Sequence, residues 1–156
     1  MSLRLRPMRW WDVAALMPLE RELFGGTAWT EEMFWSELAH PETRHYLVAE
    51  TVDDEGPATV LGYAGLLAPG PEADVQTVAV APAAQGQGVG RRLLDALIGA
   101  AHERRATSLL LEVRADNEPA IGLYGSRGFE RIAIRRRYYP GDVDAWVMRL
   151  RPLTSE

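Results

Sequence analysis

A glycine-rich segment, Gln85 to Arg91, lies between a strand-like run and a strongly amphipathic helical run, and its residue types suit anion binding. Glycines let a backbone approach a ligand closely, and a helix start offers N–H groups that no intrahelical acceptor uses. A diphosphate fits such a site. A tight turn with a purely structural role would use the same glycines, so the segment by itself leaves both interpretations open.

Two common nucleotide-binding motifs do not fit this segment. A dinucleotide fingerprint needs G-x-G-x-x-G followed about 20 residues later by an acidic residue. The segment instead has G-x-G-x-G from Gly86 to Gly90, without that acidic residue. A P-loop needs a lysine, and the chain contains none.

The segment and the run before it resemble the acetyl-CoA signature of the GNAT acetyltransferases. The resemblance lies in Gln85-x-x-Gly88-x-Gly90, preceded by Thr77 to Pro82. It implies that the loop amides bind the pyrophosphate of acetyl-CoA and that the preceding strand pairs with the pantetheine arm like an added strand. The residues implied to bind the coenzyme are Val78, Ala79, Val80, Gln85, Gly86, Gln87, Gly88, Val89, Gly90, Arg91 and Asn117.

Downstream segments are similar to the RimI type of GNAT enzyme, the ribosomal-protein alanine N-acetyltransferases. The similarity covers residues 72–150 well and the N-terminal half more loosely. It lies in Leu111 to Asn117, Ala120 to Tyr124, Gly128-Phe129 and Ile134 to Pro140.

The same resemblance implies where the acceptor binds. Trp29-Thr30 resembles the Pro-Trp-Ser segment of that subfamily, with Ala28 where proline is usual. Trp29 and Tyr138 are therefore implied to bind the acceptor, with Tyr138 beside its N-terminus. By pattern alone, Arg135 to Arg137 would be a solvated basic edge before a turn.

Acyl transfer to an amine requires a base, because an ammonium group cannot attack a thioester. Glu112 is the candidate, since it ends a strand that should diverge from the one carrying Val78 and Val80. The RimI resemblance implies the same role, with the proton passing through water. A structural role is the alternative: a strand-edge glutamate paired with Arg114 or with another arginine.

Tyr124 is the candidate acid that protonates the departing thiolate. It lies seven residues after Asn117 and therefore shares that residue's helical face. The reference pKa of tyrosine, about 10, exceeds that of a thiol, about 8.5, so Tyr124 would hold a proton to donate. The alternatives are a core aromatic packing on Phe129 and, for Asn117, a simple helix N-cap.

The acceptor is expected to be an N-terminal α-amine. Its reference pKa near 8 leaves roughly a tenth neutral at pH 7, whereas lysine, near 10.4, leaves about one part in a few thousand. One carboxylate is better matched to the α-amine. Two alternatives stay open: a GNAT enzyme for a small amine, an aminoglycoside or a lysine side chain, and a non-catalytic acetyl-CoA-binding module that acts through a partner.

The elements that must position these residues alternate in type. The order β-α-α-β-β-β-α-β-α-β-β predicts an α/β (α+β) layer fold. The GNAT resemblance implies a mixed, mostly antiparallel sheet of about six to seven strands with a V-shaped splay, flanked by about four helices. Strand-like runs are Leu3–Arg6, Tyr46–Val52, Val60–Leu67, Asp74–Ala81, Ser108–Arg114, Ile132–Ile134 and Ala145–Leu150.

The helical runs have recognisable ends. Asp12 to Phe24 is followed by two glycines, and Pro18 should break or kink it. Thr30 should cap the second helix, which His40-Pro41 stops. The third follows the glycine segment, with the stripe Leu93, Leu94, Leu97, Ile98 and Ala101. The fourth runs from Asn117 to Gly128, and its Gly122 and Gly125 indicate close packing or a weak helix.

Composition limits the remaining possibilities. The 156 residues are expected to form one domain, 1–156, with 47% hydrophobic and 25% charged residues. A net charge of −5 disfavours nucleic acid as a partner, and the absence of cysteine excludes a thiolate nucleophile. His40, His45 and His102 show no ligand spacing, so no metal is expected. Without a secretory signal or membrane-spanning run, we expect a cytoplasmic monomer or weak dimer acting on a protein or peptide N-terminus.

Overall fold

The computed structural model describes residues 2–52 and 56–153. Seven strands within these residues form one sheet, in the order β1-β2-β3-β4-β5-β7-β6. Neighbouring strands are antiparallel except for β4 and β5, which are parallel. The strands are β1 (Leu3–Pro7), β2 (Arg44–Thr51), β3 (Val60–Leu67), β4 (Glu72–Val80), β5 (Ser108–Arg114), β6 (Glu130–Tyr139) and β7 (Val143–Leu150). This is the mixed, mostly antiparallel sheet that the GNAT resemblance implied.

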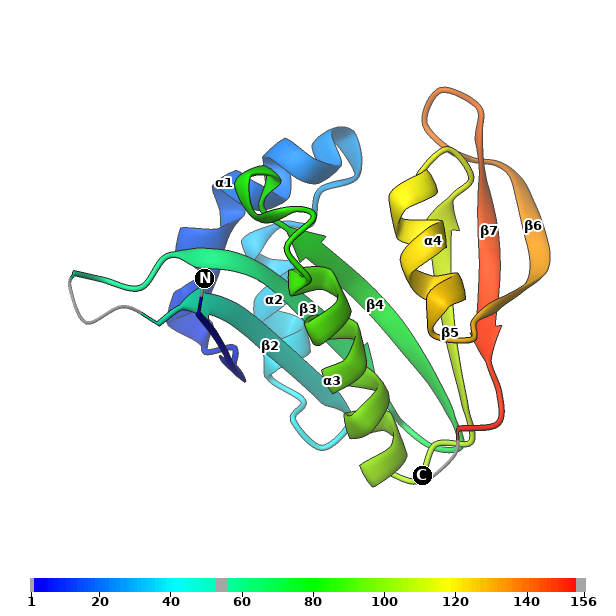
Figure 1. Cartoon of the computed structure of the whole chain (residues 1–156), viewed down its shortest axis with the longest axis horizontal. Coiled ribbons are helices and arrows are strands. Elements are labelled where there is room, and N and C mark those ends of the chain that lie inside the picture. The colour runs from blue at the N-terminus through cyan, green and yellow to red at the C-terminus, as the bar shows by residue number, and fades with distance from the viewer. Residues whose placement is uncertain (1, 53–55, 154–156) are drawn as a thin grey trace.

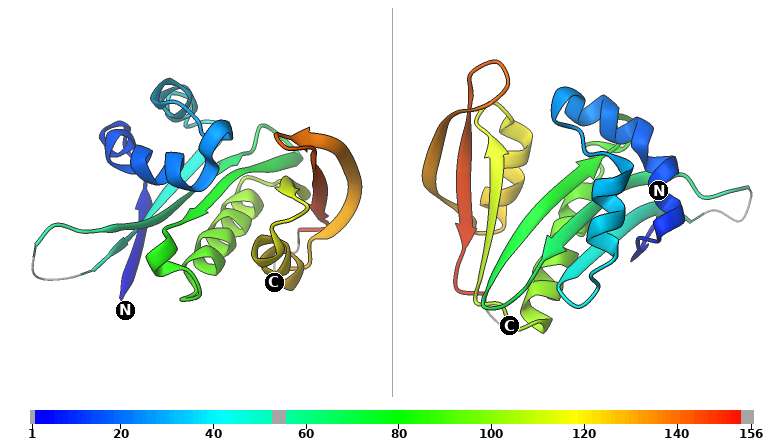
Figure 2. Two further views of the ribbon diagram at one scale, coloured as in Figure 1. Left: turned by 90° about the horizontal axis from the view of Figure 1, so that it is seen from above. Right: turned by 180° about the vertical axis from the view of Figure 1, so that it is seen from behind.

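Two pairs of helices cover the two faces of the sheet (Figures 1 and 2). Helices α1 (Val13–Phe24) and α2 (Glu31–Leu38) lie on one face, and α3 (Val89–Glu103) and α4 (Glu118–Ser126) lie on the other. Short 3-10 turns η1 (Trp10–Asp12), η2 (Gly25–Thr27) and η3 (Pro82–Ala84) precede or join them. None of the helices in the described ranges combines the length and apolarity that a bilayer span requires.

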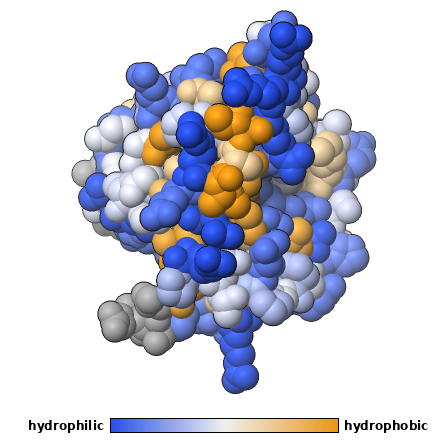
Figure 3. All heavy atoms as spheres, turned by 90° about the vertical axis from the view of Figure 1, so that its right-hand side faces the viewer, coloured by the Kyte–Doolittle hydropathy of each residue, from blue (hydrophilic) through white to orange (hydrophobic). Residues whose placement is uncertain are grey.

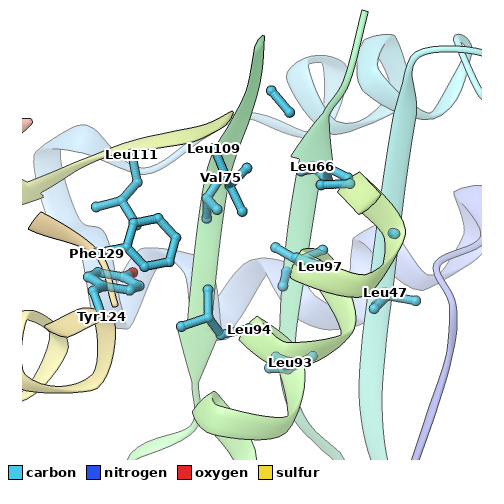
Figure 4. Packing of buried hydrophobic residues seen from close by; sticks show 14 of the residues in the cluster. Leu47, Leu66, Val75, Leu93, Leu94, Leu97, Leu109, Leu111, Tyr124 and Phe129 are labelled. Atoms are coloured by element: carbon cyan, nitrogen blue, oxygen red, sulfur yellow. The ribbon is translucent and has the colours of Figure 1, made fainter. Parts of the chain in front are cut away.

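Each pair of helices buries its own apolar stripe against the sheet. In α3 the buried side chains include Leu93, Leu94 and Leu97, and Figure 4 shows Leu94 and Leu97 pointing toward the strands that carry Val75 and Leu66. Spacing of three and four residues places such side chains on one helix face. The second core lies under α1 and α2 and is centred on Phe34 and Tyr63.

The sheet divides between β4 and β5. These strands pair only where Glu72 to Asp74 meet Ser108 to Leu110, and they diverge beyond that point. Figure 1 shows them meeting near the C-terminus of the chain and spreading toward the opposite edge. The wedge between the two half-sheets is the predicted splay.

Three details differ from the sequence-based expectation or lie outside it. Pro18 lies inside an uninterrupted α1 rather than at a break. The strand predicted over Ile132–Ile134 extends over Glu130–Tyr139, with register irregularities between Arg131 and Ala133 and between Arg135 and Tyr139. The residue types of Asp53–Pro57 predict a turn-rich linker, of which residues 53–55 lie outside the described residues.

The far edge of the sheet is strand β6, whose residues are almost all exposed. On the side of the molecule that carries β6 and β7, hydrophobic spheres form a band flanked by hydrophilic ones (Figure 3). Arg135, Arg136 and Arg137 lie on this edge, and such charges discourage pairing with another chain's strand.

Candidate active site

The backbone of β4 is open along the wedge. The Ala81 N–H donates to the Leu61 carbonyl on β3 at 2.8 Å. Alternate residues of a strand direct their backbone groups to opposite sides, so Val78 and Val80 direct theirs away from β3, toward β5. Because β5 has already diverged, this stretch can accept hydrogen bonds from an extended ligand and donate to it.

The glycine segment forms the turn from η3 into α3. Gly86 and Gly88 have φ angles of 79° and 83°, the left-handed region that side chains disfavour, and Gly88 is the N-cap of α3. The first helical hydrogen bond runs from the Arg92 N–H to the Gly88 carbonyl at 3.1 Å. Within the described chain, no turn or cap hydrogen bond uses the backbone N–H groups from Gly86 to Arg91. They are available to an anion at the helix N-terminus.

Two glutamine side chains hold this segment in place. The Gln85 amide donates to the Val80 carbonyl at 3.2 Å, and the Gln87 amide donates to the Ala83 carbonyl at 3.3 Å. The Val80 carbonyl is therefore occupied by Gln85, and the Val80 N–H remains available to a ligand. Both side chains act on the protein itself in this structure.

A cavity of about 530 Å³ lies between the glycine segment, the end of β4 and α4. It brings together every residue predicted to bind the coenzyme except Gln87, which is not on its wall. The predicted residues that line it are Val78, Ala79, Val80, Gln85, Gly86, Gly88, Val89, Gly90, Arg91 and Asn117. The cavity is a preformed cleft with free amides at one end.

A second, smaller cavity continues from the first and holds both predicted catalytic side chains. Glu112 comes from β5 and Tyr124 from α4, and Asn117 lines both cavities. The Asn117 side chain also caps α4, because its Oδ1 accepts from the Ala120 N–H at 3.2 Å. The amide nitrogen of Asn117 remains for a ligand, so the two predicted roles are compatible.

Glu112 is ion-paired in this structure, as the structural alternative required, although not with Arg114. The Arg135 Nε lies 2.9 Å from Glu112 Oε2, whereas Arg114 pairs with Asp116 at 3.0 Å. The Glu112 side chain is 35% exposed and that of Arg135 is 58% exposed. An ion pair this open to water contributes little free energy.

Tyr124 is buried against Phe129, with ring centroids 5.9 Å apart, and Figure 4 shows the two rings side by side below Leu111. Burial, reinforced by the nearby Tyr139, raises the pKa of Tyr124 to about 12. The phenol therefore keeps its proton at neutral pH. Packing in the core is compatible with the predicted role as an acid, since Tyr124 also lines both cavities.

A third cavity opens from the second and contains both residues predicted to bind the acceptor. Trp29 and Tyr138 line it, together with Glu112 and Tyr139, which it shares with the second cavity. Trp29 also packs on Phe34, with ring centroids 5.1 Å apart. We call this third cavity the acceptor mouth.

Acidic side chains line the acceptor mouth on β4. Glu72 and Asp74 lie there beside Glu112 of β5. Burial, followed by the charges of Glu72 and Glu112, raises the pKa of Asp74 above its usual range. Negative charge at this mouth favours a cationic acceptor such as an ammonium group.

Three further residues on the cavity walls were not predicted from the sequence. Glu20 of α1 is 2% exposed, and its carboxylate accepts from the Tyr63 hydroxyl at 2.6 Å and the Trp29 N–H at 2.9 Å. It fixes Trp29 in the wall. Gln76 and Tyr139 line both the second cavity and the acceptor mouth.

No cluster of three potential metal ligands occurs in residues 2–52 and 56–153. The histidines are dispersed: His45 lies on β2, where burial lowers its pKa, and His102 lies near the end of α3.

The comparisons with known proteins agree with this geometry. The Acetyltransferase (GNAT) family matches residues 10–129. The N-alpha-acetyltransferase RimI of Mycobacterium tuberculosis is 42% identical over 144 residues, which are 88% of this chain and 85% of that protein. An uncharacterised protein of Mycobacterium leprae is 44% identical over 144 residues, and the chain spans 38% of its length.

Among solved structures, the ribosomal-protein-S18-alanine N-acetyltransferase from Escherichia coli superposes with a TM-score of 0.83 at 32% identity, covering 99% of this chain and 96% of that one. The match to the family spans most of the chain and includes the glycine segment, Glu112 and Tyr124. The chain therefore belongs to the acetyltransferase (GNAT) family, as an acetyl-CoA-dependent N-acetyltransferase similar to RimI.

Proposed function

We propose that this protein acetylates the N-terminal α-amine of a protein, with the N-terminal alanine of a ribosomal protein as its acceptor. The observation that carries the proposal is the continuity of the three cavities. The amides of the glycine segment lead along the open edge of β4 to Glu112 and Tyr124, and these open on the acceptor mouth. The acceptor follows the Escherichia coli relative named as acting on the alanine of ribosomal protein S18.

The residues of the first cavity fit acetyl-CoA. The amides from Gly86 to Arg91 suit its diphosphate, and Arg91 adds positive charge. The outward-facing backbone of Val78 and Val80 suits the amides of the pantetheine arm. The thioester then lies at the junction of the first and second cavities, where Tyr124 is part of both walls.

The transfer we propose is direct, within a complex of both substrates. Glu112 accepts a proton from the ammonium group, directly or through water, and the neutral nitrogen attacks the acetyl carbonyl. The outward-facing N–H of Val78, which lines both the first and the second cavity, stabilises the oxyanion that forms. As the carbon–sulfur bond breaks, Tyr124 donates its proton to the thiolate, so that coenzyme A leaves as a thiol. We expect this chemistry in the cytoplasm, where ribosomal proteins are made.

An acceptor panel tests the proposal. The purified protein is incubated with acetyl-CoA and three acceptors: a peptide beginning with alanine, the same peptide with a blocked N-terminus and an internal lysine, and a small primary amine. We expect product from the first alone, detected by mass spectrometry.

Each other outcome contradicts the proposal in a distinct way. Product only from the blocked lysine peptide or the small amine would assign the enzyme to a different acceptor class. Coenzyme binding without product from any acceptor would indicate a module that acts through a partner. Comparing protein N-termini in cells with and without the gene then identifies the natural acceptor.

A further inference from the structure

Tyr46 reaches across the sheet to Gln76, a residue that lines the acceptor mouth. It lies on β2 opposite Gly65 of β3, and Gly65 lies opposite Thr77 of β4. A Cβ atom on Gly65 would overlap the Tyr46 ring, so the glycine is what lets the ring lie across β3. Tyr46 is 4% exposed, which places its hydroxyl in a defined position inside the protein.

The Tyr46 hydroxyl donates its proton to Gln76. The distance from Tyr46 Oη to Gln76 Oε1 is 2.7 Å, whereas Glu37 Oε1 lies 3.5 Å away and already accepts from Arg44 Nε at 2.8 Å. A contact of 3.5 Å is a weak competitor for the proton. Burial raises the pKa of Tyr46, so the hydroxyl remains a donor. The carbonyl end of the Gln76 amide is therefore occupied.

Gln76 is placed on the cavity walls by a bulge in β4. Gly65 pairs with Thr77 and Leu66 pairs with Val75, so Gln76 is the extra residue between them. A bulge redirects the side chains beside it, which explains why the consecutive residues Val75 and Gln76 both line the second cavity and the acceptor mouth. Among the described residues, no side-chain hydrogen bond uses the amino end of Gln76.

We propose that Gln76 binds the first peptide carbonyl of the acceptor through its Nε2 amino group, and that Tyr46 is the positioning residue that turns this group toward the cleft. The inference rests on the proposed function. A peptide N-terminus carries a carbonyl next to the carbon that bears its amine, and a lysine side chain or simple amine does not. A donor fixed at this point therefore selects peptide N-termini among amines.

The test compares two acceptors in two proteins. One acceptor is a peptide beginning with alanine, and the other has its first peptide bond replaced by a trans-alkene, which lacks the carbonyl. The ratio of their kcat/KM values is measured for the wild type and for Gln76→Leu. We expect the ratio to be about 3- to 10-fold larger in the wild type, the range of one hydrogen bond between neutral groups. Differences in intrinsic amine reactivity cancel between the proteins.

Tyr46→Phe separates positioning from general stability. Its expected effect is a smaller peptide-to-alkene ratio than that of the wild type, by about 2-fold or more, because the amide can then rotate. In the Tyr46→Phe/Gln76→Leu double variant the ratio should equal that of Gln76→Leu alone. The double variant also leaves no buried hydroxyl without an acceptor, so it replaces Gln76→Leu if that protein is unstable.

Three outcomes overturn the inference. An equal ratio in the wild type and Gln76→Leu, with the peptide still acetylated, removes Gln76 from acceptor binding while the proposed function stands. A Tyr46→Phe protein that loses activity equally on both acceptors reduces Tyr46 to a packing role. A wild type that acetylates no peptide N-terminus refutes the proposed function first and this inference with it.

Discussion

The proposed role of Glu112 in proton transfer predicts a pH-dependent defect in its variants. At pH 7 roughly a tenth of an α-amine is neutral, whereas at pH 9 about nine tenths is neutral and needs no base. The loss of kcat/KM in Glu112→Gln should therefore be about 10-fold larger at pH 7 than at pH 9. Initial rates on an alanine peptide between pH 6.5 and 9.5 measure the difference.

Arg135→Gln is the matched control for Glu112→Gln. It removes the partner in the 2.9 Å ion pair and keeps the carboxylate. Because exposed ion pairs contribute little, its activity should stay within a few-fold of the wild type at every pH. An equal loss for Glu112→Gln at pH 7 and pH 9 would exclude Glu112 as the base.

The proposed role of Tyr124 as the acid predicts that its removal lowers turnover without weakening acetyl-CoA binding. Burial and the neighbouring Tyr139 hold its pKa at about 12, well above a thiol's reference value of about 8.5, so it holds a proton to donate across the physiological range. Tyr124→Phe keeps the ring that packs on Phe129 and removes the proton. We expect kcat to fall by about 10- to 100-fold, with the Kd for acetyl-CoA, measured by calorimetry, unchanged within about 2-fold.

The phenylalanine variant also separates chemistry from packing. Wild-type turnover in Tyr124→Phe would leave Tyr124 with only its core role. A large loss of coenzyme affinity would instead assign its hydroxyl to binding.

Sequence reasoning located residues whose neighbours form a motif and missed those that depend on tertiary contact. Glu20 looks like a surface residue of an amphipathic helix. In the structure the buried stripe of α1 is Val13, Leu16, Met17 and Glu20, so the carboxylate occupies a core position. Gln76 has no motif at all, since its place depends on a bulge in β4 and on the Tyr46 hydroxyl from β2.

Among the elements, β6 departs furthest from its predicted extent. Its three consecutive arginines suggested a solvated basic edge before a turn, whereas pairing with β7 continues the strand to Tyr139. The strand bulges where Arg137 has a φ angle of 53° and its N–H donates to Asp144 at 3.0 Å. This irregularity places both Tyr138 and Tyr139 on the acceptor mouth, which no local pattern could predict. Strands β3 and β5, by contrast, have the predicted bounds, because continuous apolar runs with turn residues on both sides define them.

Helix α4 contains a glycine whose replacement should stabilise the folded protein. Of the two explanations for Gly122, close packing or a weak helix, the structure supports the second, since a Cβ there would meet nothing within 4 Å. Gly122→Ala should therefore raise the free energy of unfolding by about 0.5–1 kcal/mol. A thermal melt should show an increase of about 1–4 °C.

Gly90→Ala is the contrasting variant on α3. A Cβ on Gly90 would lie 3.3 Å from Leu123 Cδ2 and 3.4 Å from Val80 Cγ2, so the added methyl crowds the wall of the first cavity. It should give no gain in Tm. If Gly122→Ala also fails to stabilise, the backbone of α4 is constrained by something other than its intrinsic helix propensity.

At the scale of the whole molecule, two half-sheets meet through only three residue pairs, and the coenzyme cleft lies where they part. Helix α3 packs on the half that ends with β4, and α4 borders the half that begins with β5. The first cavity has walls from both halves. A ligand bound there contacts both sides of the wedge and should stabilise the fold as a unit.

Acetyl-CoA should therefore stabilise the protein and slow hydrogen exchange at a defined set of amides. At 100 times its Kd a ligand contributes about 2.7 kcal/mol, which for a chain of this size corresponds to an increase in Tm of about 5–10 °C.

Protection from hydrogen exchange should concentrate at Val78, Val80 and the amides from Gly86 to Arg91, the groups that no other part of the described chain occupies. Adenosine 3′-phosphate 5′-diphosphate, which keeps the diphosphate and lacks the pantetheine arm, should protect the glycine segment and leave Val78 and Val80 exchanging as in the free protein. Two results would mean that the arm does not pair with the open edge of β4: protection spread evenly over both half-sheets, or no protection of Val78 and Val80 by the full coenzyme. The thioester would then have no defined route to Glu112 and Tyr124.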